Sequence, residues 1–210
     1  MAKVFDNTKL GRAAIVVIDM QHDFVDKGAP IECVDGRTCI APINSLIAQA
    51  RVASRPIIFT QEAHRASGID FGRELDYDEP AHCYEGSLGV EIIPQLDRRQ
   101  SDYLIVKRRY SAFFATDLDI LLRGLGVDTL ILTGVATDVC VRATAQDAQQ
   151  HDYHVVVPQE CVAGTSIPAH AAALANIGYI FGHVVSLPQV LDGLPARAER
   201  APLPLLRRQM

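Results

Sequence analysis

Short apolar segments rich in β-branched residues recur along the chain, and segments with helical periodicity separate them. Each apolar segment is about as long as a buried strand, and none alternates cleanly between apolar and polar positions. Uninterrupted runs of this kind are typical of parallel strands that are covered on both faces. The predicted strands are Ala14–Ile18, Pro56–Thr60, Tyr103–Val106, Thr129–Thr133, His154–Val157 and His183–Leu187.

The segments between these strands read as helices. Apolar side chains recur on one face of each, and Thr116 is expected to cap the helix that it begins, ahead of acidic residues. The predicted helices are Thr38–Val52, Thr116–Leu125, Asp138–Gln150 and Ile167–Ile177. Regular alternation of strand and helix predicts an α/β fold, a three-layer doubly wound sandwich with a mainly parallel six-stranded sheet.

One domain accounts for nearly all of the 210 residues. The length suits a single core, and no repeat or linker divides the chain, so we expect one domain over residues 1–193. The segment 194–210 is rich in Pro, Arg and Leu and is expected to be non-globular. We expect it to pack on a partner subunit, with a crystal contact as the alternative.

Composition excludes several classes of function. The net charge is −5 and no run of Lys or Arg appears, which argues against a nucleic-acid partner. The polar N-terminus lacks the apolar core of a signal peptide, and no apolar stretch reaches the ~20 residues of a membrane span. The five cysteines are odd in number and form no CxxC pair, so a reducing cytoplasm is the expected location and a thiol is free to react.

Three predicted strand ends deliver residues that could share a site. Asp19 follows the first strand, Lys107 ends the third, and Cys140 lies in the first turn of the helix after the fourth. Parallel sheets bind small molecules at such ends. A helix N-terminus and an ammonium stabilise a thiolate, and a carboxylate can move its proton. Taken one at a time, these residues have ordinary structural roles: Asp19 could form a turn, Lys107 could be a surface charge, and Cys140 could be a small buried residue. Together the three predict a cysteine nucleophile.

The segments that hold these residues support a family resemblance. IDMQHDF, VKRRYSAFFATDL and LTGVATDVCVRATAQDA resemble the three signature stretches of the isochorismatase-like cysteine hydrolases, over about Ala13–Leu187. That superfamily includes nicotinamidases, N-carbamoylsarcosine amidohydrolase, and biuret and ureidoacrylate hydrolases. The resemblance implies a homo-oligomer, dimer or tetramer, and a site with a catalytic triad of Asp19, Lys107 and Cys140, a cis peptide bond between Val135 and Ala136, and an oxyanion hole formed by the N–H groups of Ala136 and Cys140.

The reaction implied by the resemblance is a two-step acyl transfer on a small linear amide or carbamoyl (ureido) substrate. The Cys140 thiolate adds to the carbonyl, Asp19 moves the proton to the leaving ammonia or amine, and water hydrolyses the thioester. Lys107 balances the negative charges of the site and orients Asp19.

The long polar segment 62–89 contains residues that could bind a metal ion. A connection of this length is usually functional. TQEAHRASGIDF and EPAHCYEGSLG are similar to the metal-bearing region of nicotinamidases, and the four residues that correspond to its ligands are Glu62, His64, Asp70 and His82. The first position carries Glu in place of Asp, and Asp70 stands where a His is expected. We therefore expect no required cofactor, with a divalent metal as the open alternative.

Other residues are candidates for substrate binding. His64 and Arg65 could recognise a carboxylate or ureido oxygen, as in relatives without a metal; for His64 a structural role and a metal role stay open. Phe24, Phe113 and Phe114 are expected to line the pocket, with core packing as the alternative for the last two.

Three other functions compete with the amidohydrolase. The first is a metal-dependent nicotinamidase. The second is a true isochorismatase, which Cys140 disfavours because those enzymes lack the nucleophilic cysteine. The third is a non-catalytic scaffold or thiol sensor, which would not need Asp19 and Lys107 beside the cysteine.

Overall fold

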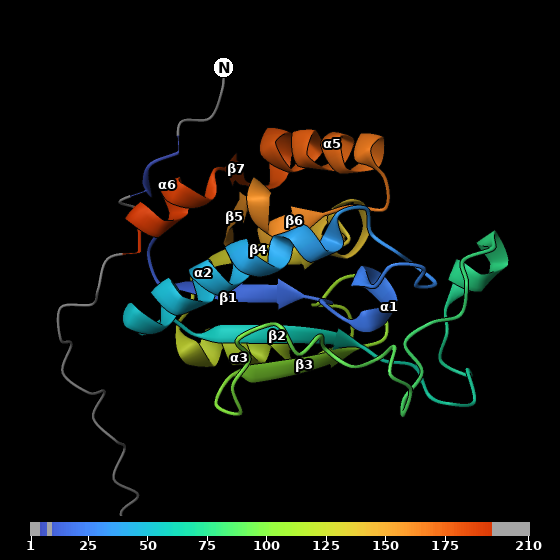
Figure 1. Cartoon of the computed structure of the whole chain (residues 1–210). Coiled ribbons are helices and arrows are strands. Elements are labelled where there is room, and N and C mark those ends of the chain that lie inside the picture. Colours follow the sequence, from blue (N-terminus) through green and yellow to red (C-terminus); the bar gives the residue numbers. More distant parts are fainter. Residues whose placement is uncertain (1–4, 8–9, 195–210) are drawn as a thin grey trace, which may run out of the picture.

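A seven-stranded sheet forms the centre of the molecule in the computed structural model, which describes residues 5–7 and 10–194 (Figure 1). The strand order is β3-β2-β1-β4-β5-β7, every pairing between strands is parallel, and the short β6 pairs with β4. The strands are β1 (Ala13–Ile18), β2 (Ile57–Glu62), β3 (Tyr103–Lys107), β4 (Thr129–Val135), β5 (His154–Pro158), β6 (Val162–Ala163) and β7 (His183–Val185).

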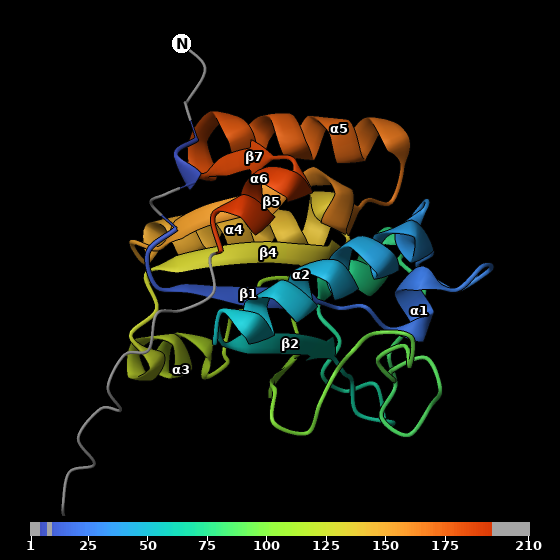
Figure 2. The ribbon, with the colours of Figure 1, turned by 60° about the vertical axis from the view of Figure 1, so that its left-hand side comes forward.

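Helices cover both faces of this sheet. The described helices are α1 (His22–Val25), η2 (Gly36–Cys39), α2 (Ile40–Val52), η3 (Arg73–Tyr77), α3 (Leu118–Leu125), η4 (Thr137–Val141), α4 (Arg142–Gln150), η5 (Gln159–Cys161), α5 (Ile167–Asn176), η6 (Ile177–Phe181) and α6 (Leu187–Asp192). Figure 2 shows α2 and α6 on one side of the sheet, with α4 behind it. The α/β three-layer arrangement that the alternating pattern predicts is therefore confirmed.

The two hydrophobic clusters of the core explain why the strands read as continuous apolar runs. Successive side chains of a strand point to opposite faces. Ile15 and Val17 of β1 belong to the cluster that packs under α2, whereas Val16 and Ile18 belong to the cluster under α3 and α4. Every residue of β1 is buried as a result.

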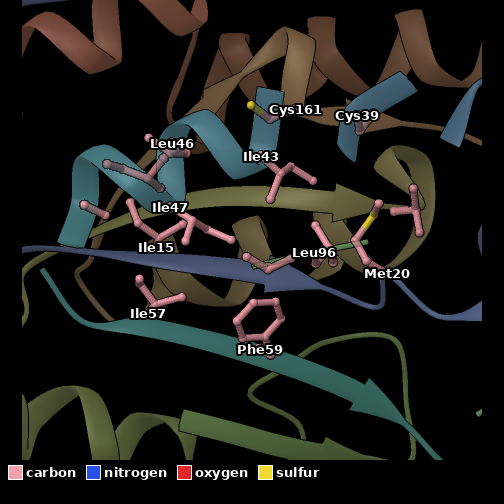
Figure 3. Packing of buried hydrophobic residues seen from close by; sticks show 14 of the residues in the cluster. Ile15, Met20, Cys39, Ile43, Leu46, Ile47, Ile57, Phe59, Leu96 and Cys161 are labelled. Carbon is pink, nitrogen blue, oxygen red and sulfur yellow. The ribbon is translucent and has the colours of Figure 1, made fainter. Parts of the chain in front are cut away.

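The hydrophobic cluster under α2 is the larger of the two. Ile43 and Ile47 of α2 point toward the sheet, where Ile15 of β1 and Ile57 and Phe59 of β2 meet them (Figure 3). Removing a side chain of this size from such a core typically costs about 2–5 kcal/mol. This packing fixes the strand ends that carry the polar residues of the site.

The structure adjusts several predicted boundaries. All six predicted strands are present; the additional β6 has only two residues, too few to produce a sequence pattern. The helix predicted over 138–150 is divided into the π-helix η4 and α4, and α3 begins at Leu118 with Asp117 as its N-cap in place of Thr116. Thr116 Oγ1 still accepts a hydrogen bond from the N–H of Leu118 at 3.3 Å.

The edge strand and the C-terminal segment differ from the simplest expectation. Residues of β3, which is at the edge of the sheet, alternate between exposed and buried toward its end, so one face of this strand is open to solvent. Leu194, the first residue of the predicted tail, is fully buried, and its carbonyl accepts a hydrogen bond from Gln49 Nε2 at 2.6 Å. Residues 195–210 lie outside the described residues.

In the part of the chain that the structure describes, no helix has both the length and the apolar character to cross a membrane.

The tips of β1 and β4 approach so closely that only glycine fits at position 134. Gly134 pairs with Ile18 in the parallel register, and its φ of +99° lies where L side chains are strained. A Cβ at this position would collide with the backbone carbonyl of Ile18. Gly134 therefore permits the close contact of the two strands whose ends carry the site.

Replacing Gly134 by Ala is expected to destabilise the fold by about 3 kcal/mol or more, because backbone strain adds to an overlap with β1. The free energy of unfolding in urea measures this. Gly124→Ala is the matched control: a Cβ there meets nothing within 4 Å, so the substitution in α3 is expected to stabilise by about 0.5–1 kcal/mol. Equal unfolding free energies for the two variants would contradict the close-approach argument.

Candidate active site

Four polar side chains from four elements converge at the carboxyl ends of the strands. Asp19 directly follows β1, Glu62 ends β2, Lys107 ends β3, and Cys140 lies in η4 after β4. The parallel register places Glu62 beside Lys107. Their exposed fractions are 0% for Asp19, 3% for Glu62, 1% for Lys107 and 4% for Cys140, so the four form one buried charge cluster.

The ammonium of Lys107 is the centre of this charge cluster. Its Nζ lies 2.7 Å from Asp19 Oδ2 and donates to Glu62 Oε2 at 2.5 Å. It also donates to Cys140 Sγ at 3.6 Å and to the carbonyl oxygen of Arg109 at 3.0 Å. The contact with Asp19 is a short, fully buried ion pair. One cation thus holds two carboxylates and the thiol together.

Thr60 on the neighbouring strand orients the Asp19 carboxylate. The Thr60 hydroxyl donates to Asp19 Oδ1 at 2.6 Å and accepts from the Asp19 N–H at 3.1 Å. Asp19 adopts a φ of 49°, in the left-handed region that aspartate tolerates better than most residues. A carboxylate oxygen of Asp19 and the Cys140 sulfur lie within 4.8 Å of each other.

Burial and Lys107 act in opposite directions on the acidic groups. Burial raises the pKa of Asp19, and the ammonium of Lys107 offsets only part of this. Burial also raises the pKa of the Cys140 thiol well above its ordinary value, again against Lys107. For Glu62, the charge of Lys107 and hydrogen bonds from His64 and His82 outweigh burial, so the pKa falls well below its usual range.

The resting charges of the charge cluster follow from these directions. Burial alone would lower the pKa of Lys107, but Asp19, Cys140 and Glu62 together raise it well above its ordinary value. Glu62 and Lys107 therefore form a permanent ion pair. The pKa values of Asp19 and Cys140 are both raised by burial, so these two groups hold a proton more readily than usual and are the candidates for proton transfer.

Two backbone N–H groups lie in the segment that carries the sulfur, those of Ala136 and Cys140. The peptide bond between Val135 and Ala136 is cis, and among the described residues nothing accepts a hydrogen bond from the Ala136 N–H. Cys140 is the fourth residue of η4, and its N–H belongs to the first turn of this helix. These two amides are the ones that the family resemblance assigns to the oxyanion hole.

A pocket of about 180 Å³ leads to the Cys140 sulfur. It is smaller than the ~300–1,000 Å³ typical for drug-sized ligands, so it suits a small molecule. Its walls combine apolar and polar side chains: Phe24, Ile31, Glu62, Glu79, His82, Tyr110, Ala136, Val139, Cys140 and Thr165. Asp19 and Lys107 lie beneath this active-site pocket, behind the sulfur.

Two of the three predicted aromatic residues lie away from the active-site pocket. Phe24 lines it, as described above. Phe113 stacks on His151 and packs against Tyr153, with ring centroids 5.1 Å and 5.9 Å apart. Phe114 is 59% exposed. Phe113 therefore packs in the core, which was the alternative to lining the pocket.

The predicted His64–Arg65 pair also lies away from the active-site pocket. His64 is fully buried and stacks on Phe71, with ring centroids 3.9 Å apart. Arg65 points to solvent and forms an ion pair with Asp70 at 2.7 Å. The pocket residues that the sequence did not indicate are Ile31, Glu79, Tyr110, Val139 and Thr165. They come from separated segments, and no spacing pattern connects them.

Three of the four candidate metal ligands meet, and the fourth does not. Donor atoms of Glu62, His64 and His82 lie within 4.8 Å of one another. Asp70 is outside this group, because its oxygens bind Arg65 and the guanidinium of Arg108 at 2.7–2.9 Å. The structure therefore does not bring Asp70 into this group, since basic neighbours bind its carboxylate.

The geometry of His82 fits a cation at this place. Its Nδ1 faces the carbonyl oxygen of Pro80 at 2.8 Å, so Nδ1 carries a proton, while Nε2 faces Glu62 Oε1 at 3.1 Å. A neutral His82 would direct a lone pair at that carboxylate, so either a second proton or a metal ion has to lie between them. Burial disfavours the charged imidazole, but Glu62 outweighs burial and raises the pKa of His82. One carboxylate and two imidazoles also form a known catalytic zinc ligand set.

Comparison with known proteins identifies the family. The Isochorismatase domain model matches residues 13–189. The chain is 31% identical to a probable inactive nicotinamidase from Arabidopsis thaliana, over 84% of this chain and 91% of that protein. It is also 31% identical to a ureidoacrylate amidohydrolase from Pseudomonas syringae pv. syringae, over 85% and 82% of the two chains. The structure of Pyrococcus horikoshii pyrazinamidase in complex with zinc superposes with a TM-score of 0.77 and 31% identity, covering 84% of this chain and 99% of the other. The chain therefore belongs to the isochorismatase family and is an isochorismatase-like hydrolase.

Proposed function

We propose that this hydrolase cleaves a C–N bond in a small linear amide or carbamoyl (ureido) compound, with Cys140 as the nucleophile. The observation that carries the proposal is the position of Lys107 Nζ, 2.7 Å from Asp19 Oδ2 and 3.6 Å from Cys140 Sγ, beneath a small pocket that reaches the sulfur. A thiol, a proton carrier and a fixed cation are the parts that covalent acyl transfer requires.

The first half-reaction forms a thioester. Asp19 takes the thiol proton, and the thiolate, stabilised by Lys107, adds to the substrate carbonyl carbon. The N–H groups of Ala136 and Cys140 receive the oxyanion. As the carbonyl reforms, Asp19 gives the proton to the leaving nitrogen, and ammonia or an amine departs with the electrons of the broken C–N bond.

The second half-reaction consumes water. Asp19 takes a proton from a water molecule, whose oxygen adds to the thioester carbonyl, and the same amides hold the oxyanion. The C–S bond then breaks, the Cys140 thiolate regains a proton from Asp19, and the acid product leaves. Lys107 keeps its proton throughout, because the groups around it raise its pKa well above the ordinary value.

A metal-dependent nicotinamidase is the second candidate function. Glu62, His64 and His82 would hold the ion, and a pyrazinamidase of similar fold is known with zinc. When bound, a divalent ion would act as a Lewis acid toward a substrate atom in the active-site pocket, which Glu62 and His82 line. The steps at Cys140 and Asp19 need no such ion.

Other assignments receive less support. A scaffold or thiol sensor gives no reason for burying Cys140 with a cation and two carboxylates, an arrangement that is costly unless it is used. One relative is named a probable inactive nicotinamidase, so activity has to be measured directly on this chain. A dimer or tetramer and a cytoplasmic location stay predictions.

Cys140→Ala is expected to lower ammonia release by at least about 10³-fold, because the covalent route disappears. The assay screens nicotinamide, N-carbamoyl amino acids, biuret, ureidoacrylate and maleamate with the wild-type protein, and then compares variants on the substrate that reacts. Cys161→Ala is the matched control, a buried cysteine outside the active-site pocket, and should retain activity. Undiminished ammonia release by Cys140→Ala would refute the proposal.

Thr60→Val is expected to move the acidic limb of kcat/KM to higher pH. The variant keeps the side-chain shape but loses the hydroxyl whose hydrogen bond lowers the pKa of Asp19. The pKa of Asp19 then rises further, so its base form appears only at higher pH. Thr60→Ser retains the hydroxyl and should follow the wild-type profile. If the valine and serine variants have the same pH profile, Asp19 is not the base.

Removal of metal separates the two candidate functions. After dialysis against a chelator, with metal content checked by mass spectrometry, kcat/KM on a linear substrate is expected to stay within about twofold, since no proposed step uses an ion. Activity that disappears on chelation and returns with Zn²⁺, Mn²⁺ or Fe²⁺, but not in a His82→Asn variant, would favour the metal-dependent nicotinamidase instead.

A further inference from the structure

We propose that the active-site pocket accepts neutral or positively charged amides and rejects substrates that carry a carboxylate, and that Glu79 is the residue that decides. This inference rests on the proposed function, because it names the substrate class of the same site. It concerns the part of the substrate that extends away from the scissile bond toward the pocket mouth.

The charges that line the active-site pocket are the first observation. Of its described lining residues, Glu62 and Glu79 carry carboxylates, His82 is the one side chain able to become cationic, and no Lys or Arg is present. Lys107 lies beneath the floor, and its N–H bonds already reach other acceptors, Glu62 among them. A substrate carboxylate would therefore find no free cation.

The arginines that follow β2 and β3 are bound to other groups. Arg65 pairs with Asp70 at 2.7 Å, and Arg108 pairs with Asp70 and Glu85, each at 2.8 Å. Arg109 donates to the carbonyl oxygen of Asp70 at 2.8 Å. These contacts hold the guanidinium groups around Asp70 and outside the pocket lining. They argue against the sequence-based expectation that Arg65 binds a substrate carboxylate.

The surroundings of Glu79 leave its charge available. Its Oε2 accepts a hydrogen bond from the Tyr110 hydroxyl at 3.0 Å, and its Oε1 lies 3.9 Å from His82 Nε2. His82 is closer to Glu62, at 3.1 Å, so a charge on the imidazole mainly offsets Glu62. Burial, followed by the charge of Glu79, raises the pKa of Tyr110, so this hydroxyl remains a neutral donor.

The net charge that a substrate meets at the mouth is therefore negative. With an exposed side-chain fraction of 27%, Glu79 is partly shielded from solvent, and charges interact more strongly there than in water. A substrate amide or ammonium can donate to Glu79 in a charge-assisted hydrogen bond. A carboxylate in the same place would be repelled.

Alkylation of Cys140 by a matched pair of reagents tests the inference without any substrate. Iodoacetamide is neutral and iodoacetate is anionic, and each forms a C–S bond to the sulfur as iodide leaves. Rates at Cys140 are followed by peptide mass spectrometry, and the iodoacetamide-to-iodoacetate ratio is divided by the ratio for free cysteine. The normalised ratio is expected to be about tenfold or more, as one repelling charge in a shielded site predicts.

Glu79→Gln should reduce this normalised ratio to near one, and Glu91→Gln is the matched control. Glu91 is exposed and does not line the active-site pocket, so its variant should behave like the wild type. A ratio near one in the wild type, or a ratio that Glu79→Gln leaves unchanged, would overturn the inference.

Hydrolysis of matched amides separates this inference from the proposed function. The pairs are succinamide with succinamate, and N-carbamoylglycinamide with N-carbamoylglycine; the neutral member of a pair is expected to react faster, and Glu79→Gln should narrow the difference. Faster hydrolysis of the anionic members would refute the inference and leave the proposed function intact. The expected alkylation ratio, without hydrolysis of any amide in this set or in the wider screen, would refute the proposed function and uphold the pocket charge.

Discussion

The buried ammonium of Lys107 is the interaction on which the rest of the site depends. Burying an unpaired charge is expensive, and a carboxylate pair would repel strongly in the same space. Lys107 contacts Asp19, Glu62 and Cys140 together, so it makes that concentration of acidic groups tolerable. With two carboxylates around one cation, only one is fully compensated. Glu62 has that role, and Asp19 is left able to hold a proton.

The fold produces this arrangement from ordinary parallel-sheet geometry. Parallel strands bring their carboxyl ends to one edge, so residues distant in sequence meet there. The register of β2 and β3 pairs Glu62 with Lys107, and Gly134 lets the end of β4 approach β1. Apolar packing against α2 on one face and α3 and α4 on the other fixes these ends in place. The charge cluster is therefore supported by the sheet, while the pocket walls combine residues of helices and strands with residues of loops.

Much of the fold could be predicted from the sequence, since the hydrophobic periodicity of strands and helices is a local signal. The strand-end rule alone was enough to group Asp19, Lys107 and Cys140. The contact of Glu62 with Lys107 was missed, because it depends on strand register and because the family motif presented Glu62 as a metal ligand. Glu79 and Tyr110 could not be found either, since the segments that carry them have no periodicity.

Rapid quenching of the first turnover, followed by peptide mass spectrometry, tests the nucleophilic role of Cys140 most directly. The predicted result is an adduct on the Cys140 peptide with the mass of the substrate less that of the departed ammonia or amine, formed at the rate at which the amine appears. Ammonia released in the first turnover with Cys140 unmodified, or an adduct on another side chain, would contradict the mechanism.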